Sequence, residues 1–286
     1  MSDGYDLDSS TPAAIELQND YARRSEEAAR NPGAKLDLAY GSHERHRLDV
    51  FSAGPQAPVL VFFHGGYWMF GSKDSRRFPA TEWNARGVSW VVVNYRLMPE
   101  HTLTEAITDA RAAVAWLSNN ADDLGLDPSR LHLTGNSAGA HLAAMAAAAD
   151  WRNDGNRPDG IASLSVVSGL FDLEPLINSK VNDGLALTAD AAFAASPIHH
   201  LPDSGPQVTV CFGGAETQAF ADQSLAYAKA CRENGNEVTL FDSPGANHFE
   251  IINEYGTPGS PLFGRLVAVV LGPKPSQSSS VNRKVE

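Results

Sequence analysis

The 286-residue chain has few cysteines and no long apolar segment. Its two cysteines, Cys211 and Cys231, can form at most one bridge, which excludes a disulfide framework as the basis of the fold. No uninterrupted apolar run approaches the roughly 20 residues that a membrane-spanning helix needs. The acidic N-terminus also lacks the apolar centre of a secretory signal. We therefore expect a cytoplasmic protein with reduced thiols and no membrane segment.

Positive charge is also scarce. The sequence has 22 Lys and Arg residues against 34 Asp and Glu residues, a formal net charge of −12. Nucleic acids and anionic membranes attract basic patches, so this balance argues against either partner. No Cys-x-x-Cys motif is present, and His43 and His46 are expected at the surface of a turn, so we expect no metal ion and no cofactor. The remaining partner is a small-molecule substrate; a homodimer is compatible with the sequence, which does not decide the oligomeric state.

Short apolar runs alternate with helical patterns along most of the chain. Strands are expected at residues 36–40, 47–51, 59–63, 90–94, 131–134, 164–167, 208–212 and 237–241. Helices are expected at residues 12–30, 76–86, 103–119, 138–149 and 219–234. Such alternation implies crossover connections and a mostly parallel sheet with helices on both faces. The prediction is an α/β fold with eight strands, of which the first two are antiparallel edge strands.

Three polar segments flank or interrupt this pattern. Residues 1–11 and 273–286 are polar and are expected to be disordered, which leaves one domain over residues 12–272. Residues 172–206 contain no clear strand, although they lie between two expected strands. An insertion of this length in a regular α/β chain is typical of a lid, so we expect these residues to cover a functional site.

The sharpest local motif is Gly-Asn-Ser-Ala-Gly at residues 135–139, between an expected strand and an expected helix. A Gly-x-Ser-x-Gly sequence in a strand–turn–helix context is typical of a nucleophile elbow. Both glycines have a steric reason, because a Cβ in so tight a turn would clash with the neighbouring strand or helix. Ser137 is therefore the candidate nucleophile. The N–H of Ala138, at the helix N-terminus, is a candidate donor to a developing anion.

A second glycine motif, His-Gly-Gly-Tyr-Trp at residues 64–68, directly follows the expected strand at 59–63. In folds with a nucleophile elbow, the loop at this place supplies further oxyanion-hole donors. Glycine suits it because a backbone without a side chain can approach a carbonyl oxygen closely. We expect the N–H groups of Gly66 and Tyr67 to complete the hole, with Gly65 as a further candidate.

A general base is the next requirement, and the chain offers several histidines. His248 follows the last expected strand, where the chain returns to the carboxyl edge of the sheet beside the nucleophile. His199 and His200 are competing candidates, because they lie in the expected lid. His64, at a strand end, and His141, one turn beyond the serine, are expected to have packing roles.

A carboxylate must orient the base, and the chain order of such triads is serine, acid, histidine. Glu216 fits this order because it lies in the loop after the expected strand at 208–212. Its carboxylate could hold one imidazole tautomer and stabilise the imidazolium. Asp172, at the end of the preceding strand, is the rival, whereas Asp222 is expected to be a solvated helix residue.

These motifs resemble a known family. The segments at 64–68, 94–100 (Asn-Tyr-Arg-Leu-Met-Pro-Glu) and 135–141 resemble the hormone-sensitive-lipase-like branch of the α/β-hydrolases. More narrowly, residues 168–176 (Ser-Gly-Leu-Phe-Asp-Leu-Glu-Pro-Leu) and 248–252 (His-Phe-Glu-Ile-Ile) are similar to the arylformamidase, or kynurenine formamidase, group. The resemblance implies an α/β-hydrolase fold across nearly the whole folded part of the chain.

The resemblance also implies an activity: metal-free hydrolysis of N-formylkynurenine to kynurenine and formate by a triad of Ser137, Glu216 and His248. The group more often has aspartate at the position of Glu216, and the additional methylene requires a small change of geometry. Members of this group also hydrolyse small acyl esters, so a short-chain carboxylesterase is the alternative. A non-catalytic ligand-binding protein on the same fold is a further alternative, although such proteins have typically lost a triad residue.

Aromatic residues near the two motifs are candidates for contact with an aryl group. Trp68 ends the glycine-rich loop motif, and Phe249 follows the candidate base. Either ring could stack on an aromatic substrate, although either could equally belong to the core.

Overall fold

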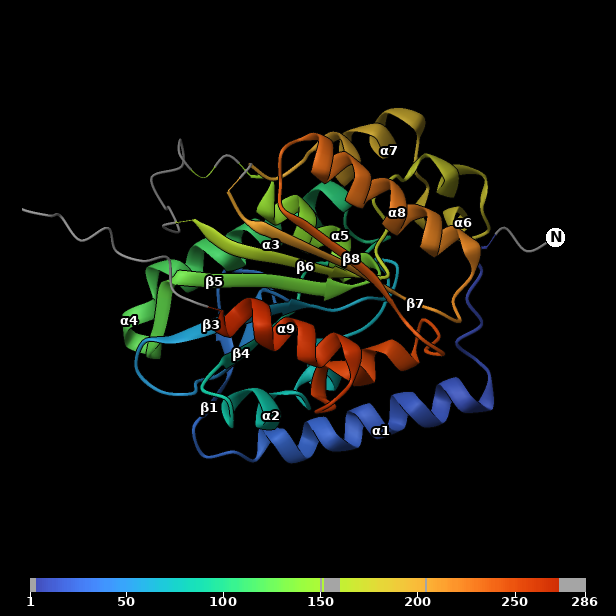
Figure 1. Ribbon diagram of the computed structural model, residues 1–286. Helices are drawn as coiled ribbons and strands as arrows, with labels where there is room; N and C mark the ends of the chain where they lie inside the picture. The colour runs from blue at the N-terminus through green and yellow to red at the C-terminus, as the bar shows by residue number, and fades with distance from the viewer. Residues whose placement is uncertain (1–3, 150, 152–159, 204, 273–286) are drawn as a thin grey trace, which may run out of the picture.

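A computed structural model describes residues 4–149, 151, 160–203 and 205–272. In this part of the chain an eight-stranded sheet forms the centre, in the order β1-β2-β4-β3-β5-β6-β7-β8 (Figure 1). The strands are β1 (Ala34–Ala39), β2 (Arg47–Phe51), β3 (Ala57–Phe63), β4 (Ser89–Val93), β5 (Leu126–Asn136), β6 (Ile161–Val167), β7 (Gln207–Gly213) and β8 (Val238–Ser243). All neighbours from β4 to β8 in this order are parallel, whereas β1–β2 and β2–β4 are antiparallel. The predicted eight strands and antiparallel edge are confirmed.

Helices cover both faces of the sheet, and each face has its own core. The helices α3 (Leu103–Asn119), α5 (Ala138–Ala147) and α8 (Gln218–Glu233) pack on one face, and α1 (Pro12–Ala29), α2 (Ala80–Asn84) and α9 (Pro261–Leu271) on the other (Figure 1). β3 divides its side chains accordingly: Val61 and Phe63 belong to the first core, and Leu60 and Phe62 to the second. This two-sided burial explains why β3 is an uninterrupted apolar run, with every residue buried.

Two helix predictions differ from the structure. The pattern at 76–86 is divided into a short 3₁₀ helix, η1 (Lys73–Arg76), and α2. Pro79 separates the two, because a proline lacks an amide donor and disfavours helical geometry in the residue before it. The helix α9 was not expected from the sequence, although its apolar residues cover β3 and β6.

The expected lid, residues 172–206, forms short helices and no strand in the residues described. It contains η2 (Glu174–Asn178), α6 (Asn182–Leu185), α7 (Ala189–Ala195) and η3 (Pro197–His199). The remaining short elements are α4 (Ala121–Leu124), before β5, and η4 (Glu250–Gly256), after β8. In Figure 1, α6 and the segment before α1 lie on the same side of the molecule as the carboxyl ends of the parallel strands.

The expectation of a disordered N-terminus is wrong for residues 4–11. Tyr5 is buried, with its ring edge-on to Phe220 and the ring centroids 5.7 Å apart. Its hydroxyl accepts a hydrogen bond of 2.9 Å from Gln223 Nε2, and its carbonyl oxygen accepts one from the Tyr67 hydroxyl. Thr217 Oγ1 donates to the carbonyl oxygen of Gly4 at 2.6 Å. Tertiary contacts therefore hold this segment; the expected tail, residues 273–286, lies outside the described residues.

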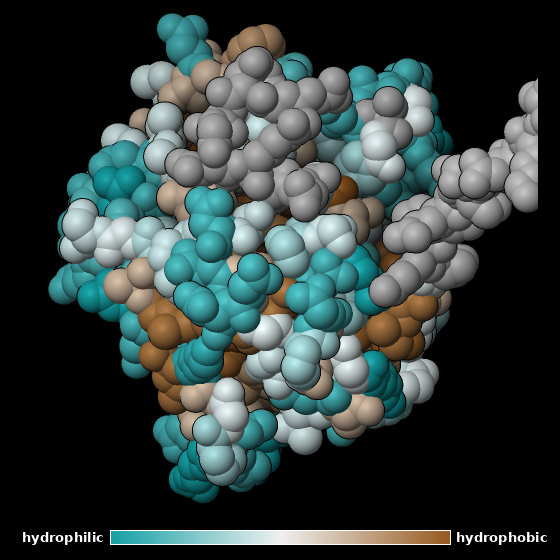
Figure 2. Space-filling view, turned by 90° about the vertical axis from the view of Figure 1, so that its left-hand side faces the viewer, coloured by the Kyte–Doolittle hydropathy of each residue, from teal (hydrophilic) through white to brown (hydrophobic). Residues whose placement is uncertain are grey.

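The opposite side of the molecule, at the amino ends of the parallel strands, faces the viewer in Figure 2. Outside the grey atoms, hydrophobic side chains there form small separate groups among hydrophilic ones. Within the described ranges, no helix combines the length and the apolar character needed to span a bilayer.

Candidate active site

Ser137 lies in a sharp turn between β5 and α5. Its backbone has φ 55° and ψ −125°, a conformation that a non-glycine residue adopts only at a cost of about 1–3 kcal/mol. A Cβ on Gly139 would lie 2.0 Å from the carbonyl oxygen of Phe63, and one on Gly135 would lie 2.4 Å from the carbonyl carbon of Gly139. Glycine is therefore required at both positions, for the steric reason that the motif suggested.

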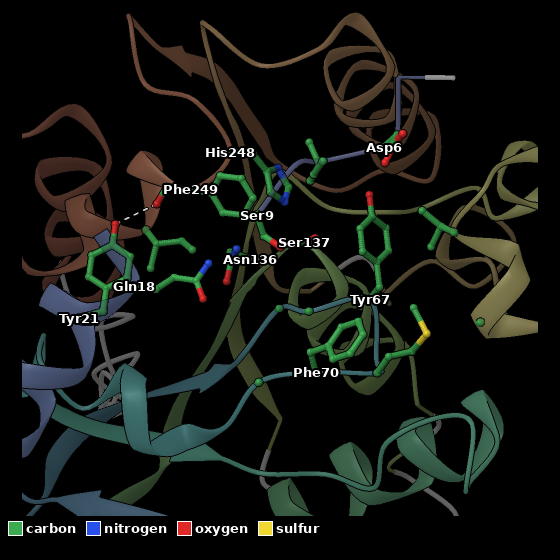
Figure 3. Close-up of a pocket in the computed structure, with 18 of the residues that line it drawn as sticks. Asp6, Ser9, Gln18, Tyr21, Tyr67, Phe70, Asn136, Ser137, His248 and Phe249 are labelled. Atoms are coloured by element: carbon green, nitrogen blue, oxygen red, sulfur yellow. Dashed lines mark hydrogen bonds between the residues drawn. The ribbon is translucent and has the colours of Figure 1, made fainter. Parts of the chain in front are cut away.

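His248 lies in the loop between β8 and η4, with 5% of its surface exposed. Its ring packs against Phe220, with centroids 4.3 Å apart, and its Nδ1 lies 2.9 Å from Oε2 of Glu216. An ionised carboxylate only accepts hydrogen bonds, so this contact places the imidazole proton on Nδ1 and leaves Nε2 as a proton acceptor. His248 and Ser137 line the same cavity, where Figure 3 draws their side chains next to each other.

The carboxylate of Glu216 is fixed on its other side as well. Oε1 accepts a hydrogen bond of 2.7 Å from the backbone N–H of Gly213 and a second one from the hydroxyl of Ser168. Ser168, directly after β6, has a positive φ of 50°. Sequence reasoning missed Ser168; its place at the carboxyl end of the strand beside β7 is the signal that could have identified it.

The competing residues lie elsewhere. Asp172 accepts a hydrogen bond of 3.0 Å from the backbone N–H of Glu174, whereas the His248 imidazole contacts Glu216. His199 and His200 are exposed and do not line the cavity. The structure therefore brings Glu216, rather than Asp172, to the candidate base.

His64 and His141 are buried and hold backbone and side-chain groups in place. His64 Nδ1 lies 2.8 Å from the carbonyl oxygen of Gly65, and its ring stacks on Tyr95 at a centroid distance of 4.4 Å. His141 lies with Nε2 2.7 Å from the carbonyl oxygen of Ala195. Burial lowers the pKa of His64 to about 3 and that of His141 to about 4, so both rings are neutral near pH 7.

The glycine-rich loop after β3 runs along the cavity beside Ser137. Gly65, Gly66 and Tyr67 line the cavity, and Gly66 has a φ of 117°, which favours glycine. A Cβ on Gly66 would also lie 2.4 Å from the carbonyl oxygen of Phe70. The backbone N–H groups of Gly66 and Ala138 have no acceptor in the described part of the chain. These donors are available to a ligand oxygen.

The cavity has a volume of about 650 Å³. Its walls come from the N-terminal segment, α1, the loop after β3, the segment around α6, and the loop that contains His248. Figure 3 shows Ser137 and His248 near the middle, with Gln18 and Tyr21 on one side and Tyr67 and Asp6 on the other. A cavity of this size can enclose a substrate with one aromatic ring.

The two aromatic residues expected to contact a substrate differ. Phe249 lines the cavity, but Trp68 does not. Trp68 has a φ of 57°, its side chain is fully buried, and its Nε1 donates to His141 Nδ1 at 3.2 Å. Trp68 is therefore a core residue, which corrects the prediction. Phe70, which is 65% exposed, lines the cavity and was missed.

Among the residues that the structure describes, no three His, Cys, Asp or Glu side chains are grouped as metal ligands. His46, one of the two histidines near the first hairpin, lies 3.0 Å from the carboxylate of Asp109. That carboxylate also forms an ion pair with Arg96. His46 therefore belongs to a polar cluster with Asp109 and Arg96 that has a structural role.

Comparisons with known proteins agree with this geometry. The chain matches a family model described as the alpha/beta hydrolase fold over residues 60–251. It is 33% identical to a kynurenine formamidase of Danio rerio, covering 77% of this chain and 76% of that protein. It is 30% identical to the esterase LipQ of Mycobacterium tuberculosis, covering 74% of this chain and 56% of that protein. The fold of a Pyrobaculum calidifontis esterase matches with a TM-score of 0.73 at 21% identity, covering 92% of this chain and 94% of that chain. The chain belongs to the α/β-hydrolase family.

Proposed function

We propose that this hydrolase cleaves an aryl N-formyl amide, with N-formylkynurenine as the substrate, by way of a formyl-enzyme on Ser137. The observation that carries the mechanism is the 2.9 Å contact of His248 Nδ1 with Glu216 Oε2, in the cavity that Ser137 also lines. The similarity to a kynurenine formamidase over 77% of the chain supports the substrate.

In the first half-reaction, Ser137 Oγ adds to the formyl carbon while its proton passes to Nε2 of His248. Collapse of the tetrahedral intermediate breaks the C–N bond, and His248 delivers the proton to the departing arylamine. In the second half-reaction, His248 deprotonates a water that adds to the formyl ester. Collapse then releases formate and restores the Ser137 hydroxyl. Glu216 remains ionised and stabilises the imidazolium in both halves.

The negative charge of each tetrahedral intermediate develops on the former carbonyl oxygen. The N–H groups of Ala138 and Gly66, with Tyr67 and Gly65 beside them, are the proposed donors to this oxygen. A single donor of this kind is worth about 10²–10³ in turnover, because it is already oriented before the reaction starts.

A short-chain carboxylesterase is the second candidate, favoured by the similarity to the esterase LipQ. Both substrates would use the same nucleophile, since an ester and a formamide pass through the same type of intermediate. They differ in the leaving group, which is an alcohol in one case and an arylamine in the other. A cytoplasmic location and catalysis without a cofactor stay predictions.

The test compares kcat/KM for N-formylkynurenine and for p-nitrophenyl acetate in the wild type and in Ser137→Ala. We expect both activities of Ser137→Ala to fall by about 10⁴–10⁶, and a fluorophosphonate probe to label only the wild type. The control Ser129→Ala, at an exposed position far from the cavity, retains both activities. EDTA leaves both unchanged. Ester turnover with an inert formamide would replace the formamidase assignment by the esterase one, and an unlabelled wild type would overturn catalysis by Ser137.

A further inference from the structure

One cation in the wall of the cavity lacks a carboxylate partner among the described residues. Arg76, at the end of η1, lines the cavity, and none of the ion pairs among the described residues includes it. Its neighbour Arg77 contrasts with it by pairing with Asp49 and Asp74. In a chain with a net charge of −12, a cation left unpaired beside the cavity requires an explanation.

The polar atoms of Arg76 are only partly satisfied. Nη1 donates to the carbonyl oxygen and to the hydroxyl of Ser75, both at 2.9 Å, whereas Nε is buried without an acceptor in the part of the chain that the structure describes. The guanidinium carbon lies 5.5 Å from the centre of the Tyr21 ring. Burial lowers the pKa of Arg76, which is the cost of holding this charge away from water and carboxylates. An anion bound here would offset that cost.

A second unsatisfied group lines the same cavity. Asn136, directly before the candidate nucleophile, is 2% exposed, and its buried Oδ1 has no donor from any described residue. Figure 3 shows Asn136, Gln18 and Tyr21 on the side of Ser137 away from Tyr67. Because Arg76 lies against the Tyr21 ring, it belongs to this side as well. Buried polar atoms are normally paired in native proteins, so the unpaired donor of Arg76 and the unpaired acceptor of Asn136 indicate a ligand that carries both an acceptor and a donor.

We propose that Arg76 binds a carboxylate of the substrate and so selects aryl formamides that carry one. This inference rests on the proposed function, because the scissile formyl group must lie at Ser137 while the anionic end of the substrate reaches Arg76. N-formylkynurenine fits such a site, since its carboxylate and its formyl group are at opposite ends of the molecule. The guanidinium forms two parallel hydrogen bonds to a carboxylate, which fix orientation as well as affinity.

The experiment measures how strongly the enzyme prefers a carboxylate. We compare kcat/KM for N-formylkynurenine and for N-formylkynuramine, which lacks the carboxylate, in the wild type, Arg76→Gln, Arg76→Lys and the control Arg86→Gln. Arg86 pairs with Glu82 and lies outside the cavity lining. We expect the ratio of the two kcat/KM values to fall about 10–100-fold in Arg76→Gln, as for loss of a charged hydrogen-bond pair. The loss appears in KM rather than in kcat, and Arg76→Lys restores part of it.

An unchanged ratio in Arg76→Gln, or an equal loss with both formamides, would overturn the proposal, because a merely structural arginine affects both alike. A second measurement distinguishes failure of carboxylate binding at Arg76 from failure of the proposed function. With p-nitrophenyl acetate as reporter, Ki is measured for 3-benzoylpropionate and for its neutral amide. If the formamides are inert, the proposed function fails. Carboxylate binding at Arg76 is then supported by a wild-type preference for the anion that Arg76→Gln loses, and is overturned by equal Ki values.

Discussion

The two halves of the cavity are built in different ways. Its floor is the carboxyl edge of the sheet, where residues 65–67, 136, 137 and 248 line the cavity. We include in the floor residues 135, 138, 139 and 216, which hold the lining residues in place, and close backbone packing leaves this region little freedom. Its roof is residues 5–9 and 180–184. The roof includes the ion pair of Lys180 with Asp6 at 2.9 Å, in which the side chains are 76% and 44% exposed. Exposed pairs of this kind contribute at most about 1 kcal/mol. The floor can therefore keep the reacting groups in fixed positions, whereas the roof can change its conformation when a substrate enters the cavity.

Among the variants of this comparison, the largest effect is expected at Glu216, which orients His248 and is itself held by Gly213 and Ser168. In Glu216→Gln the amide presents a donor as well as an acceptor, so the imidazole is no longer held with its proton on Nδ1. We expect kcat to fall by about 10⁴ with KM little changed, as for an uncharged replacement of a triad acid. Steady-state assays with N-formylkynurenine measure the loss in kcat and the change in KM.

The rival acid provides the matched control. Asp172→Asn removes a charge one strand away from Glu216 and leaves the triad contacts intact. We expect its kcat to stay within about threefold of the wild type, a difference below 1 kcal/mol. A larger loss in Asp172→Asn than in Glu216→Gln would reverse the assignment.

The steric tightness of the floor is tested by two glycines. In Gly139→Ala the new Cβ would lie 2.0 Å from the Phe63 carbonyl oxygen, so β3 or the turn must move. Overpacking of this kind costs about 1–3 kcal/mol or more, and we expect a Tm lower by about 3–10 °C and a loss of at least about tenfold in kcat. Gly264→Ala, in α9 with open space around the position, is the control and should leave Tm equal or slightly raised. Equal Tm values for both variants would contradict a tightly packed elbow.

The same contrast explains which features the sequence could predict. The motifs around Gly139 and Gly66 could be recognised because each is a run of adjacent residues directly after an expected strand. The structure adds the steric reason for the glycines, which is a clash with Phe63 for Gly139 and with Phe70 for Gly66. Glu216 followed from strand order. The direction of Trp68 could not be predicted, because it depends on the positive φ of Tyr67 and Trp68. Ser168 was missed because its contact with Glu216 joins residues 48 positions apart.

The roof was harder to predict for a related reason. Residues 4–11 have no periodicity, and their order comes from single contacts such as Tyr5 with Gln223. The helices within 172–206 have three to seven residues, too few for a helical pattern to be recognised. Elements of this kind are held by tertiary contacts rather than by their own propensity.

A variant of the roof should weaken substrate binding and leave the reactivity of Ser137 nearly unchanged. Tyr5→Ala removes the ring that packs on Phe220 and the hydroxyl that contacts Gln223, so residues 4–9 are released. We expect KM for N-formylkynurenine to rise about tenfold, because the roof must then be ordered at each binding event. The labelling rate with a small fluorophosphonate probe stays within about threefold, since the contact of His248 with Glu216 does not involve Tyr5. Tyr5→Phe, which keeps the ring, should show a smaller rise in KM; a fall in labelling as large as the rise in KM would mean that floor and roof are not separable.

The smallest effect concerns the response of the floor to acid. His132 lies on β5, the strand that leads to Ser137, with its Nδ1 2.8 Å from the Ser163 hydroxyl, and burial lowers its pKa to about 4. An imidazole in the unfolded chain protonates near pH 6.5. Between these two values the unfolded state binds the additional proton. The stabilisation from this neutral histidine is therefore complete above about pH 7 and is lost as the pH falls towards 4.

His132→Gln removes this proton uptake. The free energy of unfolding, measured by urea titration between pH 7 and pH 4.5, should then fall less steeply with decreasing pH. One proton accounts for at most about 1.4 kcal/mol per pH unit, so the difference in slope between wild type and variant cannot exceed that value. Measurement at pH 8, where the ring is neutral in both states, gives the packing cost of the substitution separately. Equal slopes for wild type and variant would show that His132 binds its proton over the same pH range in the folded and the unfolded state. The acid sensitivity of the floor would then be assigned to His64 and His141, which lie closer to the reacting groups.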